Sequence, residues 1–139
     1  MKKLLIIIAS IFIAGFLALF LTLFGIPRHV DSRFATSASL RYKYDYKTLH
    51  TTITDANDVR TLKEMLTGWS CKDGPSCGFG LDVSITLTDG SKSITFCPAC
   101  DGDGTFQIGD SDRYIEVSDK QRKMFKMIVK KYGMTFPCE

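Results

Sequence analysis

The sequence has little excess charge and few histidines, and both shortages narrow the functions open to it. It holds 18 Lys and Arg against 15 Asp and Glu, and only 2 of its 139 residues are His. Setting aside Lys2 and Lys3, which precede a long apolar run, leaves 16 basic and 15 acidic residues, a charge of +1. A domain with that charge lacks the basic footprint of nucleic-acid binding. His29 and His50 are isolated, so no Ser/His/Asp triad or metal site is predicted around them.

Charge and proline are absent from Leu4 to Ile26. An α-helix of these 23 residues would be about 34 Å long, enough to cross a hydrocarbon core of about 30 Å. Cleaved signal peptides have shorter apolar cores and a small-residue cleavage site soon afterwards, whereas Pro27, Arg28 and His29 follow here. The pattern favours an uncleaved transmembrane anchor, with a cleaved signal peptide as the alternative. No cysteine near the run could carry a lipid.

Basic residues flank both sides of this run, since Arg28 and Arg33 follow it, so their number alone does not orient the helix. A short tip with Lys2, Lys3 and the α-amine is typical of chains whose following part is exported. We therefore expect a cytoplasmic tip and membrane anchor over residues 1–26, a stalk over 27–38 and an extracytoplasmic domain over 39–139. The protein is expected in the cell membrane as a single-pass protein whose C-terminal domain lies outside the cytoplasm.

The first half of the domain shows a strand pattern followed by a helix pattern. Apolar and charged residues alternate from Leu40, which predicts a strand that continues in some form to Ile53. Thr54 or Asp55 can cap the next helix, which ends before Gly68. Its apolar residues recur at helical spacing: Val59, Leu62, Met65 and Leu66. Residues 69–80 are rich in Gly, Pro and Ser, which predicts a loop.

The strongest local pattern is a β-hairpin centred on Asp89-Gly90, a dipeptide typical of two-residue turns. Pairing Thr88 with Ser91 makes one face of the hairpin apolar and the other rich in hydroxyl groups. The same register places Leu87 opposite Lys92.

Two weaker strands are predicted over Thr105–Ile108 and Tyr114–Val117, and Ser118 with Gln121 predicts a capping box for a last helix. The buried stripe of that helix is expected to be Met124, Phe125, Ile128, Val129 and Tyr132, before Gly133 ends it. The order is strand, helix, strand, strand, an optional strand, strand, helix. This order predicts an α+β fold in which two helices pack on one face of a small antiparallel sheet.

Five cysteines are present, namely Cys71, Cys77, Cys97, Cys100 and Cys138, and two disulfides among five allow 15 pairings. The predicted hairpin register places Cys97 opposite Asp82 and Cys100 opposite Phe79, at the end where the loop with the first two cysteines enters. We therefore expect two stabilising disulfides among Cys71, Cys77, Cys97 and Cys100, with Cys138 free.

Two other uses of these cysteines stay open. A zinc site is one, although C-x5-C with C-x2-C departs from the usual ligand spacing. The other is thiol-disulfide exchange, since Cys97-Pro-Ala-Cys100 has the form of a thioredoxin-type active site. Such a site needs a helix N-terminus to lower the thiol pKa, and Asp101-Gly-Asp-Gly is a poor helix start.

Two charged segments are candidate binding sites. Asp101, Asp103 and Asp110 fit part of an EF-hand calcium loop, but Ala99 occupies the first ligand position and a solvated turn is favoured. Cations gather near the last helix: Lys120, Arg122, Lys123, Lys126, Lys130 and Lys131. They could meet anionic lipid or wall polymer, although a solvated face is the simpler interpretation. No cofactor is predicted.

The stretch Ser93–Gly104, together with Tyr132-Gly-Met-Thr-Phe-Pro-Cys138, resembles uncharacterised short membrane-anchored or secreted proteins of Gram-positive bacteria. The resemblance implies export and no particular activity. Because no catalytic grouping is predicted, we expect a non-enzymatic, membrane-tethered binding or interaction domain with a protein or envelope partner. The alternative is a thiol-disulfide oxidoreductase that uses Cys97 and Cys100.

Overall fold

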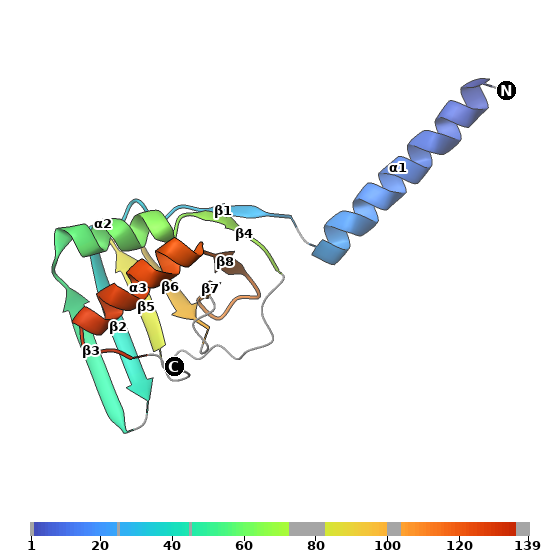
Figure 1. Cartoon of the computed structure of the whole chain (residues 1–139). Helices are drawn as coiled ribbons and strands as arrows, with labels where there is room; N and C mark the ends of the chain where they lie inside the picture. The colour runs from blue at the N-terminus through green and yellow to red at the C-terminus, as the bar shows by residue number, and fades with distance from the viewer. Residues whose placement is uncertain (1, 25, 45, 73–82, 100–103, 136–139) are drawn as a thin grey trace.

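The computed structural model describes residues 2–24, 26–44, 46–72, 83–99 and 104–135, and within them the chain is α+β (Figure 1). The helices are α1 (Lys2–Phe24), α2 (Ala56–Met65) and α3 (Asp119–Lys131). The strands are β1 (Arg28–Val30), β2 (Ser37–Tyr44), β3 (Lys47–Ile53), β4 (Gly68–Ser70), β5 (Val83–Thr88), β6 (Ser93–Pro98), β7 (Thr105–Ile108) and β8 (Tyr114–Glu116).

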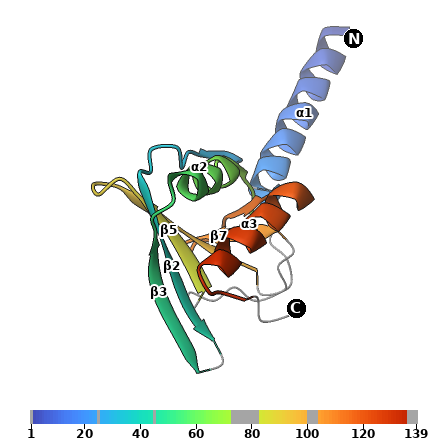
Figure 2. The same ribbon diagram turned by 60° about the vertical axis from the view of Figure 1, so that its left-hand side comes forward.

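Six strands form an antiparallel sheet in the order β3-β2-β5-β6-β7-β8, and β1 pairs with β4 in a separate two-stranded ribbon. An isolated bridge between Cys71 and Tyr114 connects the ribbon to β8 at the edge of the sheet. Helices α2 and α3 cover the same face of the sheet (Figures 1 and 2). The predicted α+β class and its small antiparallel sheet are therefore confirmed.

The core lies between that face and the two helices. Strands contribute Leu40, Ile85 and Phe96, while the helices contribute Val59, Leu62, Met65, Phe125, Ile128 and Val129, all of them buried. Phe125 of α3 meets Phe106 of β7 edge-to-face, with ring centroids 4.9 Å apart. The opposite face carries hydroxyl groups, as predicted: Thr86 and Thr95 face each other there, and their hydroxyl oxygens lie 2.9 Å apart.

The predicted caps of the two domain helices are confirmed. The Asp55 side chain accepts hydrogen bonds from the backbone N–H groups of Asn57 and Asp58 at the start of α2. Ser118 and Gln121 form the capping box of α3. Each cap satisfies backbone donors that the first helical turn leaves unpaired, so these helix starts are encoded locally.

Helix α1 exposes apolar side chains along its described length, from Ile6 to Leu21. Among the described residues, no helix has both the length and the apolarity required to cross a membrane. The span predicted over Leu4–Ile26 is thus not found in the part of the chain that the structure describes.

The segment 27–38, predicted to be a stalk, contributes instead to the folded domain. Strand β1 pairs with β4, whose residues the sequence placed in or beside a loop. The Ser32 hydroxyl is buried and donates to the Leu66 carbonyl oxygen at 2.9 Å, and Ala35 is fully buried. The sequence misses this because a three-residue strand is too short for a period to show.

The single strand predicted from Leu40 to Ile53 is in fact a hairpin of β2 and β3, with Tyr44 paired to Lys47. Tyr46 lies in the turn with a φ of 63°, a left-handed conformation that is uncommon for a residue other than glycine. Asp45-Tyr46 is not a common turn dipeptide, so the turn was not predicted.

The β5–β6 hairpin also differs from its predicted register. Thr88 pairs with Ser93 rather than with Ser91, and Leu87 pairs with Ile94. The loop therefore has four residues, and the Asp89 carboxylate accepts hydrogen bonds from the backbone N–H groups of Ser91 and Lys92.

This shift keeps each side chain on its predicted face, because the pairing moves by an even number of residues. It also removes the charged Lys92 from the position opposite the fully buried Leu87. Continuing the observed register places Cys97 opposite Ser84 instead of Asp82. The predicted pairing of Cys100 with Phe79 lies outside the described residues.

Candidate functional site

Cys97, the first cysteine of the predicted redox pair, lies on β6 and is fully buried. Its Sγ is 3.8 Å from the Gly109 carbonyl oxygen. Burial raises the pKa of the Cys97 thiol, because a thiolate is poorly solvated there. A shielded, protonated thiol is a weak nucleophile, so this geometry does not favour the oxidoreductase alternative. Cys100 lies outside the described residues.

Cys71 and Cys97 lie in one row of paired residues across adjacent strands. Cys97 pairs with Gln107, Gln107 with Tyr114, and Tyr114 with Cys71. Three strand spacings separate the two cysteines by about 14 Å, whereas the Cα atoms of a disulfide are at most about 7 Å apart. The two cysteines therefore cannot be bonded to each other.

No disulfide joins two cysteines within the described part of the chain. The predicted partners of Cys71 and Cys97, namely Cys77 and Cys100, lie outside that part, as does Cys138. The predicted pair of disulfides therefore stays a prediction, now restricted to pairings in which Cys71 and Cys97 belong to different bonds.

The calcium candidate cannot be assembled from the described residues. Asp101 and Asp103 lie outside them, and Asp110 is exposed. Across the described ranges, no three His, Cys, Asp or Glu residues come close enough to hold a metal ion. Backbone conformation and close packing explain why position 104 is glycine: the φ of Gly104 is +97°, and a Cβ there would lie 3.1 Å from the Val117 carbonyl oxygen.

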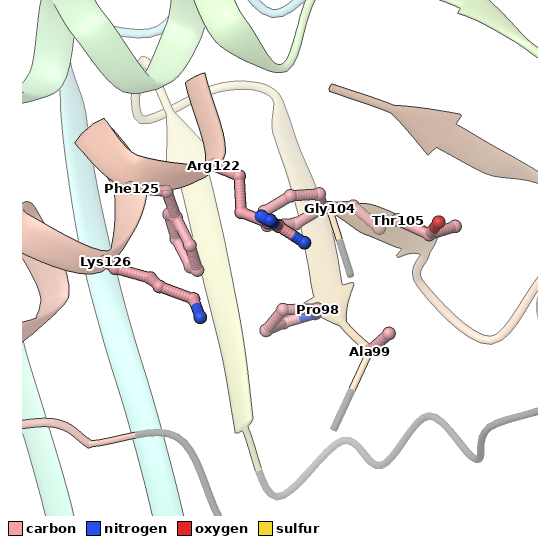
Figure 3. A pocket seen from close by; sticks show the side chains of 8 residues that line it. Pro98, Ala99, Gly104, Thr105, Arg122, Phe125 and Lys126 are labelled. Atoms are coloured by element: carbon pink, nitrogen blue, oxygen red, sulfur yellow. The ribbon is translucent and has the colours of Figure 1, made fainter. Parts of the chain in front are cut away.

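Two cations of α3, Arg122 and Lys126, extend over the ends of β6 and β7 (Figure 3). The hollow beneath them is lined by Pro98, Ala99, Gly104, Thr105 and Phe106, and its volume is about 10 Å³. That volume holds at most one water molecule, so it is no ligand site by itself. Arg122 is also paired with Asp119, 3.3 Å away.

A larger hollow, which we call the α2–α3 groove, lies between the two domain helices. Its volume is about 250 Å³, and it is lined by Asp58, Thr61, Met124, Met127, Ile128 and Lys131. Met127 is 65% exposed, although it is a large apolar side chain. Flexible thioethers adapt to apolar groups of different shapes, so the groove can accept an incoming apolar side chain.

A charged cluster holds the two helices together at this groove. Lys131 of α3 donates hydrogen bonds to Asp55 and Asp58 at the start of α2, both at 2.8 Å. The Tyr132 hydroxyl donates to Asp58 at 3.1 Å. Hydrogen bonding to Lys131 holds the pKa of Asp55 below its usual range, and hydrogen bonding to Asp55 and Asp58 raises that of Lys131. Lys131 and Arg122 are thus engaged within the domain.

Three other lysines of α3 are exposed and have no ion-pair partner among the described residues: Lys120, Lys123 and Lys130. With Met127 they occupy positions 120, 123, 127 and 130, which lie on one side of a helix. We call these four residues the lysine stripe. The six cations of the predicted basic helix therefore differ in their surroundings. Arg122 and Lys131 form ion pairs within the domain, Lys126 lies beside the hollow at the ends of β6 and β7, and the three lysines of the stripe are exposed.

Sequence reasoning located the cations but missed the groove. Met127 was the available signal, since it is an apolar residue on the charged side of an amphipathic helix. A comparison with known protein families, curated proteins and solved structures finds no match for this chain. The resemblance of its C-terminal half to exported proteins therefore stays a prediction.

Proposed function

We propose that the chain is a membrane-tethered extracytoplasmic binding domain that uses the α2–α3 groove and the lysine stripe to hold an acidic protein segment. The observation that carries the proposal is the exposed Met127, which lines the groove and lies between Lys123 and Lys130 along the stripe. The apolar part of the groove, made by Met124, Met127 and Ile128, lies beside unpaired cations and favours a ligand that combines an apolar anchor with negative charge.

The size of the groove supports a protein segment over a small molecule. Sites for small molecules enclose roughly 300 to 1,000 Å³, while this groove measures about 250 Å³. It suits one anchoring side chain, with the rest of the ligand lying over the stripe. Exposed lysines contribute mainly to association rate and specificity, so the interaction should weaken as salt increases.

The tether is supported by the sequence run Leu4–Ile26, which is long enough for a hydrocarbon core of about 30 Å. The side chains of Leu4, Leu5 and residues 22–25, near the two ends of this run, are not among those that the structure describes. Lys2 and Lys3 before the run support an inside N-terminus, and the cysteines after it suit an oxidising compartment, where disulfides would stabilise a domain of this size.

The groove is tested with two synthetic amphipathic peptides of the same pattern, one built from Glu and Leu and the other from Lys and Leu. We expect the full chain in detergent to bind the acidic peptide only, with an affinity that falls as salt rises. Met127→Glu should weaken this binding about tenfold or more, because it replaces an apolar lining side chain with a negative charge that repels the acidic peptide.

The matched control is Thr48→Glu, which makes the same change in charge at an exposed position on β3. It should leave the affinity unchanged. Equal binding of both peptides, no binding, or binding that ignores Met127→Glu would each contradict the groove as the ligand site.

The tether and its orientation are tested separately by reporter fusions at the C-terminus in cells. A reporter that works only outside the cytoplasm should be active and one that works only inside should be silent. The reverse result would refute export and disulfides together, and would make zinc the preferred role for the cysteines.

A further inference from the structure

The two-stranded ribbon of β1 and β4 lies at the C-terminal end of the apolar helix (Figure 1). Helix α1 ends at Phe24 and β1 begins at Arg28. Arg113, next to β8, donates one hydrogen bond to the Ile26 carbonyl oxygen at 2.9 Å and another to the Ser70 hydroxyl at 3.2 Å. Arg113 therefore connects the end of the apolar run to the ribbon and to the edge of the sheet by hydrogen bonds.

Trp69, the only tryptophan of the chain, projects from this ribbon. Its side chain is 68% exposed, and its one described ring contact is edge-on to His29, 5.3 Å between centroids. Ile26 beside the ribbon is also largely exposed. Tryptophan is enriched where a membrane meets water, because the indole is apolar in its body and polar at its N–H group.

The position of Trp69 along the chain matches such an interface. Trp69 pairs with His29, three residues after Ile26, which is about 10 Å of extended chain. The polar region of a bilayer is roughly 5 to 8 Å thick on each side of the hydrocarbon core. About 10 Å is the greatest height that this segment allows, and the segment reaches it only if it runs along the membrane normal. With Ile26 at the edge of the core and the segment inclined to the normal, the indole can lie within the headgroup region.

The charges around the ribbon suit lipid headgroups. Arg28 is exposed and has no ion-pair partner among the described residues. Two of the carboxylates in this region are neutralised by their own partners: Asp31 pairs with Arg33 at 2.9 Å and Asp112 with Lys72 at 3.0 Å. Asp110 is exposed, and Arg28 and Arg113, neither in a described ion pair, outnumber it. The unbalanced charge is thus positive, which is complementary to lipid phosphates.

We propose that the ribbon rests on the outer surface of the membrane, with the Trp69 indole among the headgroups and Arg28 near lipid phosphates. This contact would fix the orientation of the domain, and it rests on the tether of the proposed function. The tip of the β2–β3 hairpin, which contains Tyr46, is at the end of the domain far from α1 and would then point away from the membrane (Figures 1 and 2).

The test uses the full chain in lipid nanodiscs that contain lipid brominated near the headgroup, which quenches only tryptophans at that depth. Fluorescence from Trp69 should fall about twofold or more in brominated discs relative to unbrominated discs. The matched control is the double variant Trp69→Phe/Tyr46→Trp, which moves the single tryptophan to the exposed turn of the β2–β3 hairpin. Its fluorescence should not change.

The other outcomes separate this inference from the tether. If the protein co-purifies with the discs but Trp69 is not quenched, the tether stands and the membrane contact is wrong. Equal quenching of both tryptophans also overturns the proposed orientation. Shielding of Trp69 from aqueous acrylamide without quenching by lipid would show that a protein surface covers it. Failure to co-purify with the discs refutes the tether itself, and the contact with it.

Discussion

Substitution of Phe125 tests whether α3 is held on the sheet as the structure shows. Phe125 is 2% exposed and meets Phe106, itself 1% exposed, with ring centroids 4.9 Å apart and an angle of 82° between the rings. Phe125→Ala removes a buried aromatic ring and leaves a cavity, which costs about 3 to 5 kcal/mol. The whole domain is expected to have roughly 5 to 15 kcal/mol of unfolding free energy, so this variant should be severely destabilised.

Phe125→Leu distinguishes the contribution of the aromatic contact to stability from that of apolar burial. Leucine keeps most of the buried apolar surface but loses the edge-to-face contact, so we expect a loss of about 1 to 3 kcal/mol. Met127→Ala is the matched control on the same helix. Met127 is 65% exposed, and its truncation should change stability by less than about 0.5 kcal/mol.

The assay is urea unfolding of the full chain in detergent, followed by circular dichroism, with unfolding free energies compared at equal slopes. The expected order of stability is wild type and Met127→Ala together, then Phe125→Leu, then Phe125→Ala. A loss below about 1 kcal/mol for Phe125→Ala, or an equal loss for Met127→Ala, would refute the packing of α3 on β7.

Three further predictions concern a loop, a helix cap and the cysteines. Gly104→Ala should cost about 2 kcal/mol or more in urea unfolding and Gly90→Ala about 1 kcal/mol, because both have positive φ but only Gly104 has a backbone oxygen 3.1 Å from the added Cβ; equal costs would contradict the close approach to Val117. Asp55→Ala should lower the melting temperature at pH 7. Hydrogen bonding to Lys131 lowers the folded-state pKa of Asp55. The difference in melting temperature between wild type and Asp55→Ala should therefore begin to shrink as the pH falls below the unfolded pKa of about 4, and should be least below the folded pKa. A difference in melting temperature that grows in acid would contradict the stabilising role of the ionised Asp55 carboxylate. Non-reducing peptide mapping should find Cys71 and Cys97 in different disulfides and Cys138 free, and a Cys71–Cys97 peptide would show that the strand order β6-β7-β8 is wrong.

The sequence alone determined most of the regular elements, because the interactions that define them lie within a few residues. Asp55 and Ser118 cap helices through backbone groups two or three positions away. Alternation along β5 and β6 selects the buried face without reference to any other part of the chain. The α+β class followed from the order of these elements.

Tertiary structure decided the pairings that local patterns leave open. Strands β1 and β4 have three residues each and are separated by about 40 positions, so only their contact with each other makes them strands. In the β5–β6 hairpin, two registers preserve the same faces, and the choice between them depends on which residue must oppose the buried Leu87.

The candidate sites depend on tertiary structure even more strongly. The α2–α3 groove joins Asp58 to Lys131, which are 73 residues apart in the chain, and the ribbon carries Trp69 to the end of a helix that stops at Phe24. The local sequence shows which chemical groups each helix or strand carries and how they are spaced along it. Which groups meet depends on how helices and strands pack across the core, and no local sequence pattern encodes contacts between residues so far apart in the chain.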